Sequence, residues 1–278
     1  MATPIDTRHL GIDRVICAWE VAPGVIVDPG PASAVETLLE GVEAEPRALL
    51  LTHIHLDHAG AAGVLARRFP KLRVYVHEIG APHVIDPSRL IASASRLYGD
   101  EMDRLWGEIA PVPAERVTAL RGAEEVEGCR VEYAPGHASH HVVYFHADSR
   151  DAFVGDVAGI RIPPGELALA PTPPPDIDIE AWFESLRRVA ALEPRRLCLT
   201  HFGAVDEPTE QLAAVERWLE EAGRRSENGD REAFDVWVSA QLEAVDDDIA
   251  ARLRQAMPPD HLWLGLERYW RKRREREG

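Results

Sequence analysis

Cysteine is scarce in this sequence, and no two cysteines stand close together. The three that are present, Cys17, Cys129 and Cys198, form no CxxC pair. An odd number of isolated cysteines predicts neither a disulfide framework nor a cysteine-ligated zinc site. This cysteine usage favours a reducing, cytoplasmic location.

Long apolar runs are missing as well. Residues 1–11 contain no apolar segment of the kind found in signal peptides. No later run reaches the length of about 18 apolar residues that a membrane-spanning helix needs. We therefore expect neither secretion nor insertion into a membrane.

Basic side chains are in the minority, with 31 lysines and arginines against 47 aspartates and glutamates and a formal net charge of −16. Such a chain repels nucleic acid and anionic lipid on average, so a small-molecule substrate is the expected partner. Hydrophobic residues make up 45% and charged residues 28% of the 278 residues, which is typical of a globular protein with a large core.

Apolar runs typical of strands alternate with apolar side chains at helical spacing. Residues 15–28 predict an antiparallel hairpin with a Pro-Gly turn. Further strands are expected at 48–51, 72–76, 117–120, 129–133, 141–145, 152–154 and 197–200, and helices at 34–39, 59–69, 179–192 and 207–222. The chain begins with a strand-helix-strand unit, and the strands from residue 117 onward are expected to be mostly antiparallel. The fold class is therefore α/β or α+β.

Three segments fall outside this alternation. Residues 81–110 predict two helices, separated near Gly99, that form an insertion. Residues 162–178 are rich in proline and predict an irregular surface loop. A break at 226–230 precedes a predicted helix at 233–256 and a polar Arg/Glu-rich tail.

Four potential metal ligands follow the strand at 48–51 in the spacing HxHxDH: His53, His55, Asp57 and His58. Active sites favour the carboxyl ends of strands in α/β folds. His53 and His55 are two residues apart, so in an extended segment both point to the same side and can hold one metal ion. Asp57 and His58 come after the turn and can face a second ion.

Three more candidates each follow another predicted strand: His137 in APGHASHH, Asp156 in VGDVAG and His201 in LTHFG. A histidine near a strand end is often only solvated or hydrogen-bonded, which is the plain alternative for each residue taken alone. The recurrence of ligand types at strand ends favours one shared metal site.

Together these residues resemble the metallo-β-lactamase superfamily over about residues 12–225. The resemblance implies a four-layer αββα sandwich with metals in a cleft at one sheet edge, here with the helical insertion at 81–110. We expect a catalytic domain at 1–225 and a C-terminal helical extension at 226–278. The extension can pack on the core or form the contact of a homodimer, and the sequence favours neither.

The resemblance also implies a role for each ligand. One metal would be held by His53, His55 and His137, the second by Asp57, His58 and His201, with Asp156 as the bridge. Zinc is the expected divalent metal, with manganese or iron as alternatives, because all three accept histidine and carboxylate ligands. Two such ions can hold a hydroxide between them, since zinc lowers the pKa of bound water to roughly 7. Asp57 would orient this nucleophile and take a proton.

Other residues near these ligands narrow the range of reactions that the resemblance implies. β-Lactam-hydrolysing relatives usually replace or lack the bridging aspartate that stands here at Asp156. Acyl-homoserine lactonases carry a tyrosine shortly after it, where this chain has Val157 to Ile160. Glyoxalase II enzymes share all seven ligands, but their glutathione-binding basic residues are not found here. Relatives that process tRNA prefer glycine at Leu56, and flavodiiron relatives place glutamate at His55.

Hydrolysis of an ester, lactone or thioester remains, and phosphoesters stay open because the same hydroxide attacks both kinds of centre. Two alternatives from other classes are a mononuclear-iron persulfide dioxygenase and a metal-binding protein without turnover. We expect residues 81–110 and 162–178 to form the pocket walls.

Some residues outside the ligand set are also candidates. Tyr98, Arg161 and His140 are the candidate substrate-binding residues. Asp28 resembles an early aspartate that supports the site in the family, and an ordinary turn residue is the equal alternative. His141 is expected to be a buried histidine partnered by the backbone.

Overall fold

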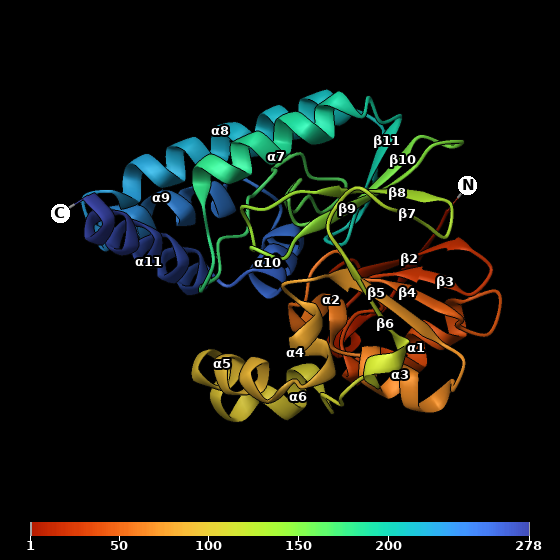
Figure 1. Ribbon diagram of the computed structural model, residues 1–278. Helices are drawn as coiled ribbons and strands as arrows, with labels where there is room; N and C mark the ends of the chain where they lie inside the picture. The colour runs from red at the N-terminus through yellow and green to blue at the C-terminus, as the bar shows by residue number, and fades with distance from the viewer. Residues whose placement is uncertain (1, 278) are drawn as a thin grey trace.

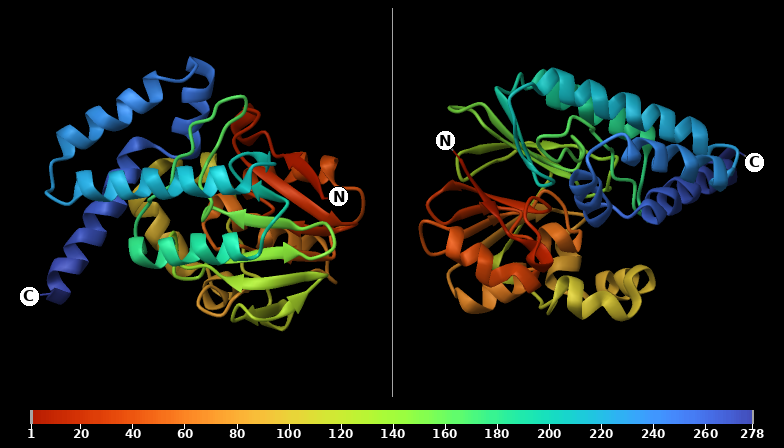
Figure 2. Two further views of the ribbon diagram at one scale, coloured as in Figure 1. Left: turned by 90° about the horizontal axis from the view of Figure 1, so that it is seen from above. Right: turned by 180° about the vertical axis from the view of Figure 1, so that it is seen from behind.

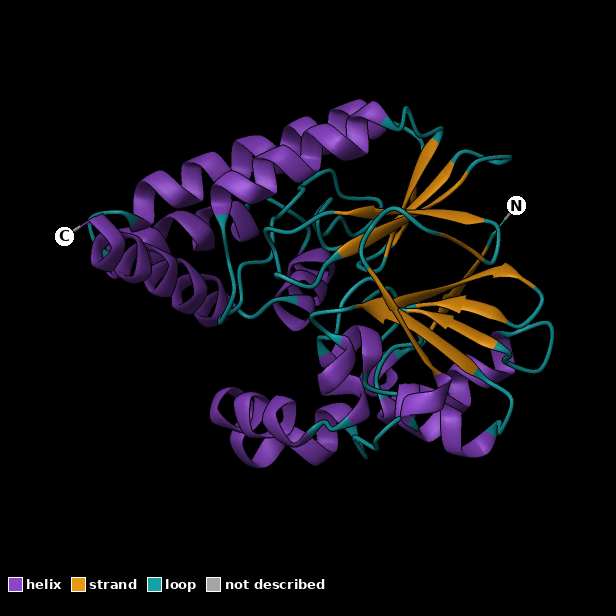
Figure 3. Ribbon diagram, viewed as in Figure 1, coloured by secondary structure: helices purple, strands orange, loops and turns teal. Residues whose placement is uncertain are grey.

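Two sheets form the centre of the molecule (Figure 1). They are seen in a computed structural model that describes residues 2–277. The first sheet runs in the order β1 (Thr3–Asp6), β2 (Cys17–Ala22), β3 (Val25–Val27), β4 (Ala48–Leu50), β5 (Arg73–His77) and β6 (Val117–Leu120). The second runs in the order β12 (Gly203–Val205), β11 (Arg196–Leu199), β10 (Asp151–Gly155), β9 (Val142–His146), β8 (Cys129–Tyr133) and β7 (Glu125–Val126). Helices cover the outer faces, so the layers follow the predicted αββα order (Figure 3).

The direction of the strands in the first sheet agrees with the prediction only in part. β2 and β3 pair antiparallel around the Pro23-Gly24 turn, which confirms the hairpin. β3, β4, β5 and β6 are parallel neighbours. The expectation that the strand at 117–120 joins the antiparallel run is therefore wrong. The helices between β5 and β6 carry the chain back across the sheet, which is the connection that parallel strands require.

The space between the sheets is filled by large side chains. Trp19, Tyr144 and Phe153 are each at most 1% exposed and meet there. In β4, Leu50 joins this inner core while Leu49 packs beneath the helices on the outer face. A strand buried on both faces needs a continuous apolar run, and this firmly packed strand leads directly into the HxHxDH segment.

Helices pack on both outer faces. The first sheet is covered by α1 (Val35–Gly41), α3 (Ala62–Arg68) and α4 (Ala81–Ile85), and the second by α7 (Ile179–Ala191) and α8 (Pro208–Ser226). Short 3-10 turns occur at η1 (His9–Gly11), η2 (Ala32–Ala34), η3 (Gly99–Glu101) and η4 (Ala114–Arg116).

The helix α7 is capped by Asp178, whose carboxylate accepts a hydrogen bond from the Ala181 N–H at 3.0 Å. The helix α7 buries Trp182, Leu186 and Val189, which are spaced so that they lie on one face of the helix.

The segment 81–110 holds three helices rather than the two predicted: α4, α5 (Ser88–Tyr98) and α6 (Met102–Trp106). Pro87 separates α4 from α5, because a proline disfavours the helical conformation of the residue before it, here Asp86. Gly99, with φ of +52°, ends α5 where the break was expected. No residue of α5 is fully buried, although the helix is amphipathic.

The prediction of a surface loop at 162–178 is wrong for its middle part, because residues 168–173 are buried. Because proline has no backbone N–H, its burial leaves no N–H group without a hydrogen-bond partner. The Thr172 hydroxyl donates to the carbonyl of Leu262, a residue of the C-terminal extension, at 2.9 Å. The extension therefore covers this loop, which no local pattern indicates.

The single helix predicted at 233–256 is two helices, α9 (Arg231–Glu243) and α10 (Asp247–Ala256). Asp246 separates them, and its carboxylate caps α10 by accepting a hydrogen bond from the Asp248 N–H at 2.9 Å. Aspartate at such a position favours a new helix start over continuation.

The polar Arg/Glu-rich tail predicted at the end of the chain is the helix α11 (Pro259–Glu277), which agrees with the helical extension expected from residue 226 onward. Leu262, Trp263 and Leu266 are at most 2% exposed and join the core around α7 and α8. Three apolar residues on one helix face suffice to dock an otherwise charged segment. Within residues 2–277, no helix is long and apolar enough to cross a membrane.

The loop that contains η1 contacts two distant parts of the chain. His9 Nε2 donates to the carbonyl of Leu105 in α6 at 2.8 Å. Gln255 of α10 donates to the His9 carbonyl at 3.1 Å, and Arg252 of α10 donates to both the carbonyl and the carboxylate of Asp13. One N-terminal loop therefore fixes α6 and α10 relative to each other.

Candidate active site

The residues HIHLDH leave β4 in an extended conformation and turn into the short helix α2 (Leu56–Ala59) at His55. His53 Nε2 lies 3.0 Å from His55 Nδ1, and His137 Nε2 lies 2.9 Å from the same nitrogen. His137 comes from the loop between β8 and β9, on the other sheet. Three nitrogens from two sheets thus converge, and they form the first candidate metal cluster.

Hydrogen bonds behind these rings fix which nitrogen carries the proton. A carbonyl only accepts, so His137 Nδ1 donates to the Pro171 carbonyl at 2.9 Å. His53 Nδ1 donates to the Thr52 hydroxyl at 3.1 Å. Both Nε2 atoms then present lone pairs to His55, whose single N–H can satisfy only one of them. A cation would satisfy all three nitrogens, so this donor set fits a metal ion.

Burial keeps these imidazoles neutral. It lowers the pKa of His53 well below its ordinary value, and the nearby His58 and His55 act in the same direction. Burial, together with His137, lowers the pKa of His55 to about 3. Neutral imidazole is the form that binds metal, so the cluster is in its binding form at neutral pH.

Asp57, His58 and His201 form a second candidate cluster. Asp57 Oδ2 lies 3.2 Å from His201 Nε2 and 3.7 Å from His58 Nε2. His201 follows β11, and its Nδ1 donates to the Val15 carbonyl at 2.7 Å, which turns Nε2 toward Asp57. The N-terminal and C-terminal halves of the catalytic fold therefore both contribute to this cluster.

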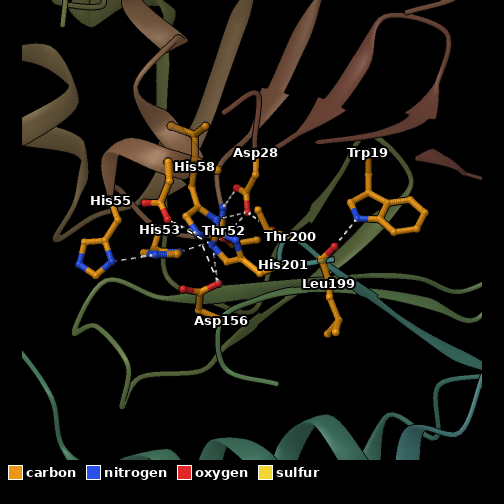
Figure 4. A network of polar contacts seen from close by, with 12 residues as sticks. Trp19, Asp28, Thr52, His53, His55, His58, Asp156, Leu199, Thr200 and His201 are labelled. Carbon is orange, nitrogen blue, oxygen red and sulfur yellow. Dashed lines mark hydrogen bonds and ion pairs between the residues drawn. The ribbon is translucent and has the colours of Figure 1, made fainter. Parts of the chain in front are cut away.

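Asp156, at the end of β10, lies between the two clusters (Figure 4). Its Oδ1 is 3.3 Å from His58 Nε2, and its Oδ2 is 3.5 Å from His137 Nε2. His58 Nε2 and Asp156 Oδ1 are buried without a hydrogen-bond partner of good geometry among residues 2–277, and such atoms fit a shared cation. Burial acts to raise the pKa of Asp156, but His58 and His201 outweigh it and hold that pKa well below its ordinary value.

A fully buried carboxylate, Asp28, holds the ligand segments from behind (Figure 4). It accepts hydrogen bonds from the Thr52 N–H at 2.8 Å and the Thr52 hydroxyl at 2.7 Å. The Thr200 hydroxyl donates to it at 3.1 Å, and His58 Nδ1 donates at 2.7 Å. The supporting role that the resemblance implied for Asp28 is confirmed, and the ordinary turn residue is excluded.

Gly155 lets Asp156 reach its position. The φ of Gly155 is +49°, and a Cβ there would lie 2.4 Å from Thr52 Oγ1 and 2.9 Å from His141 Nε2. His141 Nε2 accepts a hydrogen bond from the Asp156 N–H at 3.3 Å, so the predicted backbone partner is present for this nitrogen. Among residues 2–277, its Nδ1 is buried without a hydrogen-bond partner. Only glycine fits between the residues that orient both clusters.

We expect Gly155→Ala to weaken metal binding about ten- to hundredfold, because the added methyl displaces the groups that orient the ligands. The same clash should destabilise the fold by roughly 1–3 kcal/mol. Metal titration and thermal unfolding measure the two effects. Gly229→Ala is the matched control, because Gly229 also has a positive φ, +74°, but no atom lies within 4 Å of an added Cβ. Equal losses in the two variants would contradict the packing argument.

A cavity of about 550 Å³ opens onto His55, Asp57, His137 and Asp156. One wall of this active-site cavity comes from α5 and α6, and the opposite wall from the end of α10 and the start of α11. Both groups of helices project beyond the same edge of the sheets (Figure 2). The cavity is thus built where the ligands gather.

The three predicted substrate-binding residues lie in different places. Tyr98 lines the cavity, and its ring lies edge-on to His261 of α11 with centroids 5.4 Å apart. His140 is 8% exposed and stacks behind His53, while Arg161 Nε donates to a backbone carbonyl. Neither His140 nor Arg161 is among the described residues that line the cavity.

Several lining residues escaped the sequence analysis. His9, Gln255, Met257, His261 and Arg268 line the cavity from the N-terminal loop and the C-terminal extension. No motif marks them in the sequence, because only the packing of α10 and α11 against the catalytic fold brings them to the site.

Comparisons with known proteins agree with this geometry. Residues 21–201, which include all seven candidate ligands, match the family model described as the metallo-beta-lactamase superfamily. The metallo-beta-lactamase fold-containing protein ST1585 of Sulfurisphaera tokodaii is 27% identical over 213 residues, which are 73% of this chain and 77% of that protein. A hydroxyacylglutathione hydrolase of Yersinia pestis is 26% identical over 255 residues, 86% of this chain and 85% of the relative.

Solved structures share the fold. The crystal structure of ST1585 from Sulfolobus tokodaii aligns with a TM-score of 0.69 at 24% identity, over 95% of this chain and 97% of that one. The structure of TTHA1623 in a di-iron-bound form aligns with a TM-score of 0.55 at 27% identity, over 72% of this chain and 91% of that one. From the family model, the shared architecture and the ligand spacing, this chain belongs to the metallo-beta-lactamase superfamily.

Proposed function

We propose that this protein is a metal-dependent hydrolase that cleaves an ester, a lactone or a thioester. The observation that carries the proposal is a pair of ligand clusters, joined by Asp156, that open to a cavity at His55 and Asp57. Family membership supports hydrolysis, and so does the similarity to hydroxyacylglutathione hydrolases.

Two divalent cations in these clusters would make a water molecule nucleophilic at neutral pH and polarise the substrate carbonyl. Asp57 is the ligand carboxylate best placed to take the proton, because its side chain is 18% exposed and lines the cavity, whereas that of Asp156 is 3% exposed. Burial acts to raise the pKa of Asp57, but His58 and His201 outweigh it and lower that pKa. The carboxylate is therefore ionised, which is the form that binds a metal ion.

The buried histidines orient rather than react. His53, His58 and His137 are at most 1% exposed, and each is held through Nδ1 by a hydrogen bond to the surrounding fold. Rings held in this way cannot rotate when substrate binds, so the site is organised before the reaction begins.

The test of the proposal is a metal analysis followed by a substrate panel of esters, lactones, thioesters and phosphoesters. We expect two divalent ions per chain and hydrolysis of at least one acyl class, lost on chelation and restored by metal. A metal-loaded protein that hydrolyses no member of the panel would overturn the proposal. If the protein contains iron and consumes oxygen when a persulfide is supplied as substrate, the dioxygenase alternative replaces the hydrolase proposal.

The two-cluster arrangement can be tested separately. His53→Ala should lower the metal content from about two ions to about one per chain, because the second cluster keeps Asp57, His58 and His201. His83→Ala, on α4 and outside both clusters, is the control and should retain both ions. Elemental analysis of dialysed protein gives the readout, and two retained ions in His53→Ala would speak against the assignment of the first cluster.

A further inference from the structure

The walls of the active-site cavity are largely apolar. The amphipathic helix α5 contributes Leu90 and Leu97 to this lining, and neither side chain is fully buried. From the opposite wall, Met257 and Pro258 at the junction of α10 and α11 face the same space. Apolar side chains that line a cavity from both walls indicate a ligand with a substantial apolar part.

Two arginines interrupt this apolar lining, one from each wall. Arg96 lies on α5 and Arg268 on α11, and both line the cavity. The carbonyl of Pro175 accepts a hydrogen bond from Arg268 Nε at 3.0 Å, which holds this side chain at the wall. Among residues 2–277, neither guanidinium has a carboxylate within ion-pair distance.

Acidic residues are abundant in this chain, which has a formal net charge of −16. Glu101, which also lines the cavity, pairs with Arg104 and so leaves Arg96 and Arg268 uncompensated. A guanidinium offers paired N–H donors that match a carboxylate or a phosphate. The cavity therefore has apolar walls and a positive region away from the metal ligands.

The cavity is also bounded at one point between its walls. Tyr98 of α5 lies edge-on to His261 of α11, with ring centroids 5.4 Å apart. The two walls touch there, so this contact bounds the space that a ligand can occupy.

Building on the hydrolase function proposed above, we propose that the substrate is an amphiphilic anion. It is an ester or thioester with a medium-length apolar chain, packed between α5 and the junction of α10 and α11, and with one carboxylate or phosphate bound by Arg96 and Arg268. In the hydrolysis itself, water adds to the acyl carbon, the bond to the alkoxy oxygen or thiol sulfur breaks, and the leaving group takes a proton. A polar hydroxyacyl-glutathione thioester satisfies the arginines but leaves the apolar walls uncovered.

The test uses acyl thioesters of two to ten carbons in three series. One series carries a neutral thiol, N-acetylcysteamine, the second an anionic thiol, 3-mercaptopropionate, and the third a carboxylate at the far end of the acyl chain. We expect kcat/KM to rise about threefold per added methylene up to the limit set by the walls. We also expect one of the two anionic series to exceed the neutral series at least tenfold, and which one does so locates the anionic group.

Variants connect these preferences to the residues. Arg268→Gln should lower kcat/KM for the preferred anionic series about tenfold or more and reduce the gap to the neutral series. Arg271→Gln is the matched control, because Arg271 is exposed on the same helix and does not line the cavity. The proposal would be overturned if short neutral thioesters, or S-lactoylglutathione, were hydrolysed as fast as long anionic thioesters.

A binding experiment separates this proposal from the hydrolase function. Octane-1-sulfonate, an anion that ligates metals poorly, is compared with neutral octyl methyl sulfone by calorimetry on the metal-loaded protein. We expect the sulfonate to bind at least tenfold more tightly in wild type, and Arg268→Gln to remove this difference. If both bind alike, the amphiphilic-anion proposal is wrong even when hydrolysis is observed. If the sulfonate is preferred but no ester, lactone or thioester is cleaved, the hydrolase function is wrong and the ligand class stands.

Discussion

Replacing Asp57 by asparagine is expected to lower kcat about a hundredfold to ten-thousandfold while the protein stays folded. Asp57 Oδ2 lies 3.2 Å from His201 Nε2, and the side chain borders the cavity. The amide has the same shape, but it lacks the negative charge that binds a cation, and its oxygen is far less basic than a carboxylate oxygen. Steady-state kinetics on the best acyl substrate, with a thermal melt to verify the fold, provides the measurement.

A matched variant shows whether the effect belongs to the site. Asp103→Asn changes an exposed aspartate of α6 that does not line the cavity, and it should keep wild-type kinetics. Asp57→Asn with full metal content and a kcat near that of wild type would rule out Asp57 as the proton acceptor. A loss of metal without a loss of fold would assign the effect mainly to ligation.

Asp28→Ala is expected to have the largest effect on stability. The Asp28 carboxylate accepts hydrogen bonds from Thr52 N–H, Thr52 hydroxyl, Thr200 hydroxyl and His58 Nδ1, and it is fully buried. Each buried donor left without a partner costs about 1–3 kcal/mol, so the free energy of unfolding should fall by roughly 4 kcal/mol or more. For a chain of this size, that corresponds to a Tm lower by about 10 °C.

The same substitution frees the ring of His58, so metal affinity should fall about ten- to hundredfold. Thr200→Val serves as the comparison, because it removes one hydrogen bond to Asp28 and leaves the other three. Denaturant unfolding and metal titration on both variants give the measurements. If the Asp28→Ala variant is no less stable than the Thr200→Val variant, water replaces the carboxylate, and Asp28 does not hold the ligand segments in place.

The convergence of the candidate metal ligands could be predicted from the sequence because four of them lie within six residues, His53 to His58. His53 and His55 alternate on an extended segment, and the apolar run before them is a strand buried on both faces. The role of Asp28 was harder to predict, since a turn aspartate with φ of +48° is common on its own. Only its contacts with Thr52 and Thr200, far along the chain, distinguish the two interpretations.

The errors share a physical cause. Whether 117–120 pairs parallel or antiparallel depends on where the preceding helices return the chain, and not on the four residues themselves. The loop at 168–173 is buried because Leu262 and its neighbours cover it. The Arg/Glu-rich end of the chain docks on the core through a few apolar residues, because another part of the chain provides the surface on which they pack. Burial against distant segments is not encoded in a local pattern.

The contacts of the N-terminal loop set an order for the assembly of this protein during synthesis. Val15 receives the hydrogen bond of His201 and Asp13 that of Arg252, partners separated by 186 and 239 positions. At a translation rate of roughly 5–20 residues per second, the histidine-rich segment leaves the ribosome on the order of ten seconds or more before these partners appear. Cation capture by the second cluster, which needs His201, is therefore expected to come late in synthesis, after the first cluster already has its three histidines.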